Sequence, residues 1–441
     1  MMKTDIMKLA DQAKMHENVL TVMATVDTGF EWMAVDEYKE KLGSNAQYVK
    51  ERGRIYFNLR QKDFSKVQDM RSIDNVYIVA DASWLPFSGI MKGSELDSDL
   101  EIIRKFAKEK ISLRRALDAW KEIVNFHGIM YPSLREYQDS DLALQRPKSP
   151  VHCARTKKRG LDPSSASKES LLRFRVTCER TGSHSFESQD VARIVGGELQ
   201  DTFNWIVDLV QYHLQIVCHV KLGEIITSLR VTHESKHRRN IQFYGPTTLR
   251  STICYSLIRL ASPLPGDIII DPMCGGGSIP LEAAIAFPNT YLLGGEIHCN
   301  AVDRARANVA AMNVDRKLDL IQWNLLHLPL KDSFVDIFVT DMPFGKRSGS
   351  ITDNRVFYKK WLLEMGRVSK LGSGRLVLLT KDRRSIATAL KMYGKLFRVT
   401  KTLGANIGGL QAAVYVLLRT NISWEDHKTV EHDAKRVKVQ E

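Results

Sequence analysis

From about residue 246 onward, short apolar runs alternate with stretches whose apolar residues have helical spacing. The apolar runs lie at residues 267–271, 291–296, 318–323, 335–341 and 375–380. Such an alternation is typical of a doubly wound, mainly parallel sheet. Two later runs, 397–403 and 412–419, are too close together for a crossover helix and predict a closing antiparallel hairpin. We therefore expect residues 246–420 to form an α/β domain.

The N-terminal part of the chain predicts a smaller α+β region. Runs with strand character lie at residues 19–26, 54–59 and 75–80, and a stretch with helical spacing, 30–42, lies between the first two. Residues 100–127 are rich in charged residues and helix formers, which predicts one or two helices. A strand–helix–strand order with a further strand is typical of a ferredoxin-like half, which we assign to residues 19–130.

Composition changes at residues 145–170, where three prolines, five serines and seven Lys or Arg residues stand against two acidic ones. We interpret this segment as a flexible basic linker. Residues 171–235 then predict a second small domain, with a strand, a helix weakened by Gly196-Gly197, and a hairpin around Gly223. The last residues, 421–441, predict a polar tail.

The net positive charge of the chain is compatible with a nucleic-acid partner but does not establish one. Over 441 residues, 64 Lys and Arg against 51 Asp and Glu give a net charge of +13, which is compatible with a nucleic-acid partner. No apolar run approaches the roughly 20 residues that cross a bilayer, and the N-terminus lacks the apolar core of a secretory signal. The 6 cysteines are scattered without a CxxC pair, which predicts a reduced, intracellular chain without a zinc site of its own. We expect a cytoplasmic protein, with the nucleus as the second compartment to consider.

A glycine-rich loop follows the first strand of the C-terminal domain. The strand leads into Asp271-Pro272-Met273-Cys274-Gly275-Gly276-Gly277-Ser278, and a helix then opens with Pro280 in its first turn. Glycines between a strand and a helix let a ligand approach the main chain at the carboxyl edge of a sheet. A plain structural turn can have the same pattern, but Glu296 ends the next strand, 25 residues after Asp271. A carboxylate there can accept hydrogen bonds from both ribose hydroxyls of an adenosine ligand.

The charge of this loop favours S-adenosylmethionine over a dinucleotide. A pyrophosphate group requires an open helix N-terminus without a competing anion, whereas Asp271 begins the loop. S-adenosylmethionine carries a sulfonium and an ammonium group, so nearby carboxylates are tolerable or favourable. Asn324, after the third strand, is placed to hydrogen-bond the adenine amine.

A second motif, Asp341-Met342-Pro343-Phe344-Gly345, ends the strand at 335–341. In such a turn the Asp side chain and a backbone carbonyl accept hydrogen bonds from an exocyclic amine, while Pro343 stiffens the turn and Phe344 stacks on an extruded base. These hydrogen bonds draw the amine nitrogen toward tetrahedral geometry and free its lone pair for displacement at a methyl group. The segment alone also suits a structural strand end with a buried Phe. Its place after the glycine loop favours an amine methyltransferase.

With both motifs, the chain resembles the THUMP-domain tRNA guanosine N2-methyltransferases over nearly its whole length. The matching segments include residues 25–31, 52–57, 174–178, 237–240, 243–252, 271–275 and 340–347. The resemblance implies a ferredoxin-like region and a THUMP domain (171–235) that grip the tRNA acceptor end, followed by a Rossmann-type methyltransferase domain (246–420). It also implies methylation of N2 of a guanosine in the tRNA acceptor stem, typically at position 6, and a small zinc-binding activator subunit as partner.

Carried onto this sequence, the resemblance implies a role for each motif residue. The catalytic set is Asp341, Pro343 and Phe344. The set that binds S-adenosylmethionine is Asp271, Met273, Gly275, Gly277, Glu296 and Asn324. The RNA-contact candidates are Arg238, Arg239, Lys346 and Arg347, although basic surface residues are often only solvated. Three positions depart from the family pattern: Gly276 replaces Thr or Ser, and Glu296 and Asn324 stand where Asp is common.

Other classes of function stay open on the sequence. The Asp/Asn-X-Pro-aromatic turn also serves methyltransferases that act on DNA adenine or protein glutamine, which would not need the THUMP-like region. A non-catalytic RNA-binding protein can keep the fold, although the intact Asp341 and Glu296 argue against it. We also expect a fragment that begins near Gly245 to fold and bind S-adenosylmethionine, because the glycine loop and Glu296 lie beyond that point.

Overall fold

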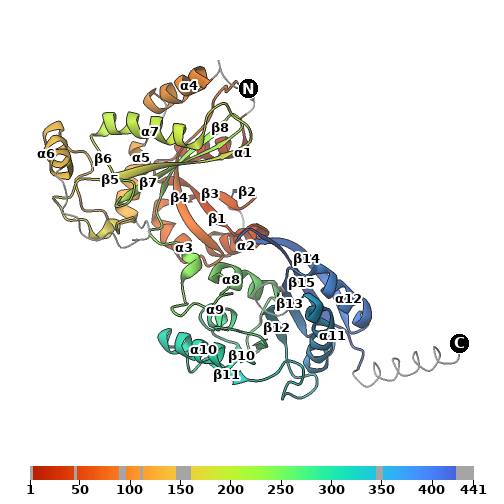
Figure 1. Cartoon of the computed structure of the whole chain (residues 1–441). Coiled ribbons are helices and arrows are strands. Elements are labelled where there is room, and N and C mark those ends of the chain that lie inside the picture. Colours follow the sequence, from red (N-terminus) through yellow and green to blue (C-terminus); the bar gives the residue numbers. More distant parts are fainter. Residues whose placement is uncertain are drawn as a thin grey trace. The chain divides into compact units, whose positions relative to one another are not determined.

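The computed structural model describes residues 3–43, 47–88, 96–109, 113–145, 160–343 and 351–423 (Figure 1). The chain forms two compact units. The N-terminal unit comprises Met1–Thr25, Val35–Met70 and Asn75–Ser235, and the C-terminal unit comprises Val26–Ala34, Arg71–Asp74 and Lys236–Glu441. Two short segments from the beginning of the sequence therefore belong to the C-terminal unit.

A seven-stranded sheet forms the centre of the C-terminal unit, in the order β11-β10-β9-β12-β13-β15-β14. Its strands are β9 (Ile268–Asp271), β10 (Tyr291–Glu296), β11 (Leu318–Gln322), β12 (Ile337–Asp341), β13 (Arg375–Thr380), β14 (Phe397–Ile407) and β15 (Leu410–Arg419). Strands β9 to β13 are parallel, and β15 lies antiparallel between β13 and β14. The predicted doubly wound sheet with a closing hairpin is confirmed.

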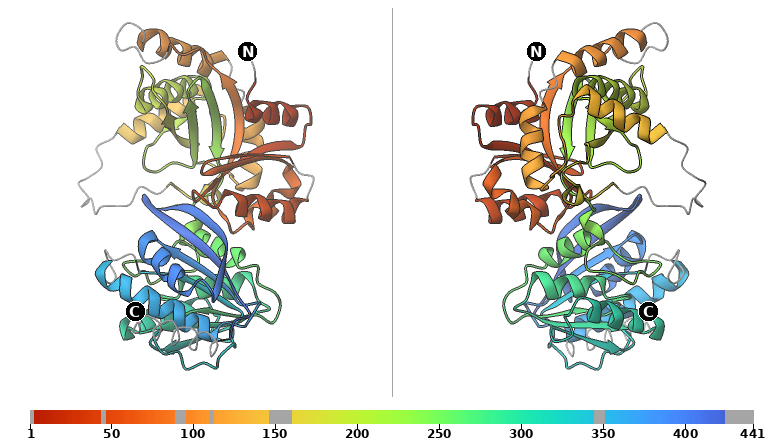
Figure 2. Two further views of the ribbon diagram at one scale, coloured as in Figure 1. Left: turned by 90° about the vertical axis from the view of Figure 1, so that its right-hand side faces the viewer. Right: turned by 90° about the vertical axis from the view of Figure 1, so that its left-hand side faces the viewer.

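Helices cover both faces of this sheet. From β9 the chain moves outward in one direction through β10 and β11 and in the other through β12 and β13. Because parallel connections are generally right-handed, this change of direction is expected to place helices on opposite faces of the sheet, and helices lie on both faces (Figure 2). These helices are α8 (Ser251–Leu260), α9 (Ser278–Ala286), α10 (Cys299–Ala311), α11 (Ile351–Val368) and α12 (Arg383–Tyr393). An apolar cluster that includes Phe338, Leu376, Tyr358, Leu362 and Ile386 joins β12 and β13 to α11 and α12.

The N-terminal unit is built on one eight-stranded sheet with the order β2-β3-β1-β4-β8-β7-β5-β6. Its strands are β1 (Val19–Val26), β2 (Tyr48–Glu51), β3 (Arg54–Arg60), β4 (Ile73–Trp84), β5 (Arg173–Thr181), β6 (Ile206–Val207), β7 (Leu214–Lys221) and β8 (Glu224–Arg230). Strand β4 pairs antiparallel with β8, so that Ile78 lies opposite Leu229. We predicted the regions 19–130 and 171–235 as separate domains, but their strands form one shared sheet.

The helices of the N-terminal unit include one that the sequence analysis did not predict and one that it expected the Gly196-Gly197 pair to weaken. They are α1 (Asp5–Lys14), α2 (Glu31–Leu42), α3 (Phe64–Gln68), α4 (Leu96–Glu109), α5 (Arg114–Ile123), α6 (Leu134–Gln145) and α7 (Ser188–Phe203). The unpredicted α1 buries Ile6, Leu9, Ala10 and Ala13. Helix α7 continues without a break through Gly196 and Gly197, because its buried face of Val191, Ile194, Val195 and Leu199 outweighs their low helix propensity.

Part of the expected linker makes specific main-chain hydrogen bonds. The Leu161 N–H donates to the Tyr212 carbonyl at 2.7 Å, and the Ile129 N–H donates to the Ser170 carbonyl at 2.9 Å. Residues 160–170 therefore differ from the predicted flexible segment, since Pro and Ser also form fixed turns. Residues 146–159, residues 424–441 of the tail, and the site candidates Phe344, Lys346 and Arg347 lie outside the described residues. Within the described ranges, no helix combines the length and apolar character needed to cross a bilayer.

Candidate active site

Three acidic side chains end neighbouring parallel strands of the C-terminal unit. Asp271 is the last residue of β9, Glu296 of β10 and Asp341 of β12. Strand β9 lies between β10 and β12 in the sheet, and all three run in the same direction. The sheet therefore gathers these three carboxyl groups at its carboxyl edge, where ligands of open α/β sheets bind.

The glycine loop leaves space for a ligand beside its main chain. Gly275 and Gly277 have φ values of +55° and +85°, a left-handed conformation that glycine adopts without strain. A methyl group added to Gly275 would meet no heavy atom within 4 Å. Gly277 is also the N-cap residue of α9, so the positive end of that helix faces the loop.

Glu296 fixes the loop to the end of β10. Its Oε2 accepts a hydrogen bond from the Gly275 N–H at 3.0 Å, and its Oε1 accepts from the N–H groups of Ile297 and His298 at 2.9 and 3.0 Å. The side chain is 8% exposed. A carboxylate offers about four acceptor positions, so Glu296 retains capacity for a ribose hydroxyl.

Asp271 is a buried carboxyl whose proton affinity is strongly raised. Its Oδ1 accepts hydrogen bonds from the Thr340 hydroxyl at 2.8 Å and the Met273 N–H at 3.1 Å. Burial raises the pKa of Asp271 to about 7, and the charge of Glu296 acts in the same direction. The two hydrogen bonds oppose this shift without cancelling it.

Asp341 carries an acceptor atom that no described residue uses. Its Oδ1 is buried and has no hydrogen-bond partner among the residues that the structure describes. Burial raises the pKa of Asp341 to about 8, and the neighbouring charge of Asp271 adds to this effect. Because buried polar atoms are nearly always paired, this oxygen is a candidate contact for a ligand that brings a donor.

A buried network holds the turn after Asp341. The Pro343 carbonyl accepts hydrogen bonds from Asn354 Nδ2 at 3.0 Å and from the Tyr358 hydroxyl at 2.7 Å. The Tyr358 and Thr380 hydroxyls lie 2.8 Å apart. The three side chains are at most 1% exposed. The sequence analysis missed them; the only available signal was the four-residue spacing of Asn354 and Tyr358, which places them on one face of α11.

Trp323 and Asn324 form the edge of the site beyond β11. Trp323 Nε1 donates to the Pro272 carbonyl at 3.1 Å. Its ring lies so close to Gly295 that an added methyl group would come 1.7 Å from Trp323 Nε1, which explains why this position is glycine. Asn324 is exposed, and its Oδ1 accepts from the Leu326 N–H at 3.0 Å. Its side-chain oxygen thus fixes the local turn, and its contact with adenine remains a prediction.

The structure places Arg239 in an internal ion-pair cluster around Glu282, which is fully buried. Arg71 donates to Glu282 from Nε at 2.6 Å and from Nη2 at 3.0 Å, and Arg239 Nη2 donates at 2.9 Å. Asn240 also donates to this carboxylate. Arg239 is thus paired within the protein, whereas Arg238 is exposed, and the contacts of both residues with phosphate stay predictions.

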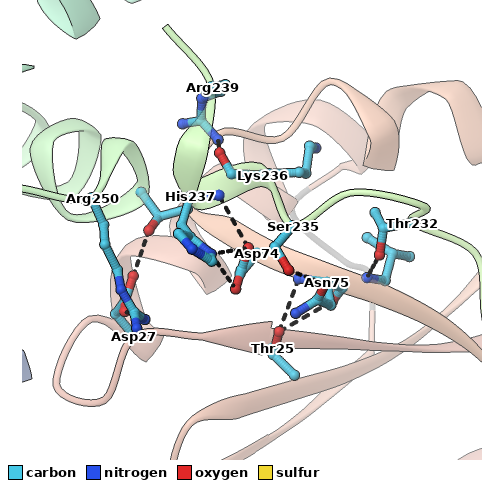
Figure 3. Close-up of polar contacts among 12 residues, drawn as sticks. Thr25, Asp27, Asp74, Asn75, Thr232, Ser235, Lys236, His237, Arg239 and Arg250 are labelled. Atoms are coloured by element: carbon cyan, nitrogen blue, oxygen red, sulfur yellow. Dashed lines mark hydrogen bonds and ion pairs between the residues drawn. The ribbon is translucent and has the colours of Figure 1, made fainter. Parts of the chain in front are cut away.

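Other contacts tie the two early segments into the C-terminal unit. Arg250 Nη1 donates to Asp27 Oδ1 at 2.9 Å, and the Thr252 hydroxyl donates to the other oxygen of Asp27. The main-chain N–H of His237 donates to Asp74 at 3.1 Å, and its ring Nδ1 lies 3.1 Å from both Asp74 oxygens (Figure 3). The C-terminal unit is therefore not built from residues 246–420 alone.

Comparisons with known proteins agree with this geometry. Residues 238–413 match the family described as RMKL-like, methyltransferase domain. The chain is 36% identical over 450 residues to the tRNA (guanine(6)-N(2))-methyltransferase THUMP3 of Bos taurus, covering 91% of this chain and 88% of that protein. It is 26% identical over 402 residues to the U6 snRNA (guanine-N(2))-methyltransferase THUMPD2 of Bos taurus, covering 81% and 78%.

A solved structure shares the fold. The crystal structure of TrmN from Thermus thermophilus has a TM-score of 0.67 and 20% sequence identity, and the match covers 91% of this chain and 99% of that chain. The human THUMP3 protein is similar to this chain at 35% identity over 464 residues, covering 93% and 90%. By this similarity along nearly the whole sequence, the chain belongs to the THUMP3 family of tRNA (guanine(6)-N(2))-methyltransferases.

Proposed function

We propose that this protein transfers a methyl group from S-adenosylmethionine to N2 of a guanosine in tRNA, at position 6 of the acceptor stem. The observation that carries the proposal is the buried Oδ1 of Asp341, which has no partner among the described residues and lies at the same sheet edge as Asp271 and Glu296. Family membership agrees with this chemistry, because the THUMP3 relatives are named for methylation of guanine 6 in tRNA.

The residues at the sheet edge fit the methyl donor. When bound, S-adenosylmethionine supplies a methyl group activated by a sulfonium cation. Glu296 would accept from the ribose, and the open main chain at Gly275 would allow the ligand to approach closely. We assign Asp271, Met273, Gly277 and Asn324 to the remainder of this pocket. A neighbouring positive charge would also favour the ionised forms of Asp271 and Asp341.

Asp341 would act as the acceptor for the target amine. One hydrogen of the guanine N2 amine would bond to Oδ1, which no residue of the described ranges contacts by a hydrogen bond; this would orient the nitrogen and draw its lone pair out of conjugation with the ring. After transfer, the methylated nitrogen would carry a positive charge and would release one proton to the Asp341 carboxylate or to bulk water. The Pro343 carbonyl accepts hydrogen bonds from Asn354 and Tyr358. These bonds fix the turn that follows Asp341 before substrate binds. Phe344 is our candidate for stacking on the extruded base.

Partners and location complete the proposal. We propose contacts of Arg238, Lys346 and Arg347 with tRNA phosphates. We also propose a small zinc-binding activator subunit, which β11 could accommodate because it is an edge strand of the described sheet. The proposed location is the cytoplasm, with the nucleus as a second compartment, and fractionation of tagged protein tests it.

The experiment must decide whether the substrate is tRNA or U6 snRNA. U6 snRNA is the substrate named for the more distant THUMPD2 relatives. Purified protein, with and without the activator subunit, is incubated with labelled S-adenosylmethionine and either total tRNA or U6 snRNA. Digestion and mass spectrometry then identify the modified nucleoside. N2-methylguanosine in tRNA supports the proposal. Label in U6 snRNA alone would contradict the substrate, and S-adenosylmethionine binding without transfer to any RNA would favour a non-catalytic protein.

A further inference from the structure

Two neighbouring aromatic side chains, Phe243 and Tyr244, lie exposed on a loop of the C-terminal unit. Their side chains are 49% and 52% exposed, although aromatic residues of this size are mostly buried. The loop that carries them spans residues 242–245, and we refer to it as the 242–245 loop. Exposed aromatic pairs on a fixed main chain are typical of interaction surfaces.

One buried side chain fixes this loop to the glycine loop. Asn308, which is fully buried, accepts hydrogen bonds through Oδ1 from the N–H groups of Gln242 at 3.1 Å and Phe243 at 2.9 Å. Its Nδ2 donates to the Phe243 carbonyl at 3.1 Å and to the Gly276 carbonyl at 3.0 Å. All four hydrogen-bonding positions of the amide are therefore used to join the two loops. The 242–245 loop is thus fixed beside the segment that we assign to the methyl donor.

Two arginines stand beside the aromatic pair. A methyl group added to Gly245 would lie 3.1 Å from Arg304 Nε, and one added to Gly276 would lie 3.7 Å from the same atom. The guanidinium of Arg304 is thus next to both loops, and its Nε has no hydrogen-bond partner among the described residues. On the other side, the Tyr244 hydroxyl donates to the main-chain carbonyl of the exposed Arg238 at 3.1 Å.

We infer that the 242–245 loop is a stacking surface for a nucleotide of the RNA substrate next to the target guanine. Phe243 and Tyr244 would stack on a base, and Arg238 and Arg304 would contact the flanking phosphates. Because a base in a duplex must leave its stack before its amine can react, at least one neighbouring base loses its stacking partner. A protein surface beside the methyl-donor loop is placed to replace that partner. This inference rests on the proposed function.

The inference is tested with the full-length protein, in complex with the activator subunit if methylation requires it. The variants are Phe243→Ala, Tyr244→Ala and the double substitution. Tyr291→Ala is the matched control, because Tyr291 is 69% exposed but begins β10 and so lies at the sheet edge opposite the site. Tyr244→Phe keeps the ring and removes only the hydroxyl that contacts the Arg238 carbonyl.

Three quantities are measured for each variant: kcat/KM for tRNA, the Kd for tRNA, and the Kd for S-adenosylmethionine. Loss of one stacked base is expected to lower kcat/KM for tRNA by about 10-fold or more; Tyr244→Phe, which keeps the ring, should lose less than Tyr244→Ala, and Tyr291→Ala should stay close to wild type. The Kd for S-adenosylmethionine should not change, which also shows that the variants are folded. In a separate readout, ultraviolet cross-linking of the wild-type complex should place an RNA adduct at residue 243 or 244.

Several results would overturn the inference. Wild-type kcat/KM in the double variant, or no adduct at either residue, would remove the 242–245 loop from the RNA surface. A weaker Kd for S-adenosylmethionine would assign the loop to the methyl-donor pocket instead. Loss of activator binding with an unchanged Kd for tRNA would make it a protein-docking surface. If the wild-type protein binds tRNA without methylating it, the proposed function fails, and the tRNA Kd of the variants still decides the inference.

Discussion

Asp341 and Asp271 end adjacent parallel strands, and the charge of Asp271 helps to raise the pKa of Asp341 to about 8. Burial is the larger cause, and it also raises the pKa of Asp271 to about 7. The two carboxyl groups differ in their partners. Asp271 Oδ1 is satisfied by Thr340 and Met273, whereas Asp341 Oδ1 has no partner among the described residues. Asp341 is therefore the group of the pair that is available to a substrate.

The first prediction concerns the pH dependence of methyl transfer. If the ionised carboxylate of Asp341 is the better acceptor for the amine, kcat/KM for S-adenosylmethionine, which reports the ligand-free protein, should rise as pH increases through about 8, the pKa of this group without ligand. Asp341→Asn keeps an acceptor oxygen and removes the ionisation, so its activity should be lower and independent of pH near that value. Initial rates between pH 6 and 9 at constant ionic strength measure both profiles. A wild-type profile that stays flat through this range would argue against the role of Asp341.

The second prediction concerns stability. A carboxyl whose folded-state pKa lies above its unfolded value contributes stability below the unfolded pKa, and that contribution is lost as pH rises through the folded pKa. For Asp271 and Asp341, whose pKa values rise from the ordinary 3.8 to about 7 and about 8, the loss begins above pH 3.8 and is complete just above the raised values. The Tm of the wild-type protein should therefore decrease between pH 6 and pH 9, and Asp341→Asn should reduce that decrease. Differential scanning calorimetry at the two pH values makes the comparison, and an equal decrease in both proteins would contradict it.

The third prediction concerns the network behind the turn. Tyr358→Phe removes the hydroxyl that donates to the Pro343 carbonyl and contacts Thr380, while it keeps the buried ring. Loss of one hydrogen bond of about 1 kcal/mol to a positioning group should reduce kcat about 5-fold. The Kd for S-adenosylmethionine should stay unchanged, because Tyr358 contacts the turn and not the glycine loop. An equal loss in kcat and in cofactor affinity would indicate general damage to the fold instead.

The fourth prediction replaces an expectation from the sequence. A fragment that begins near Gly245 lacks Arg71, Arg239 and Asn240, which together satisfy the buried Glu282 carboxylate. Removing the partners of a buried charge costs about 3–5 kcal/mol, so we now expect this fragment to be unstable. In the full chain, Arg71→Ala should lower Tm by several degrees. Arg306→Ala is the matched control, because Arg306 pairs with Asp303 on the surface and its loss should have little effect. A stable, cofactor-binding fragment would contradict this account.

Much of the fold could be predicted because buried parallel strands are continuous apolar runs. For that reason β10 (Tyr291–Glu296) and β13 (Arg375–Thr380) match the predicted ranges at both ends. The shared sheet of the N-terminal unit was not predicted, because the pairing of β4 with β8 joins segments about 150 residues apart. Local periodicity carries no information about such a pair.

In the candidate site, too, residues marked by a local sequence pattern could be predicted, and residues whose role depends on distant partners could not. Asp271, Glu296 and Asp341 could be found because each ends an apolar run, and the sheet order then brings them to one edge. Asn308, Glu282 and Tyr358 could not be found, because their roles depend on partners in distant segments. The ion pair of Arg239 could not be predicted for the same reason: its sequence neighbours are basic and suggest RNA, while its partner Glu282 is 43 residues away.

The central claim is that Asp341 supports methylation of N2 on guanosine 6 of tRNA. The most direct measurement compares two tRNA transcripts that differ only in the base pair at position 6, G·C in one and A·U in the other. Wild-type protein should form N2-methylguanosine in the first transcript alone. Asp341→Ala should form none while binding both transcripts with nearly wild-type Kd, since loss of this acceptor should cost about 3 kcal/mol or more in the barrier. Equal methylation of both transcripts, or turnover retained by Asp341→Ala, would contradict the account.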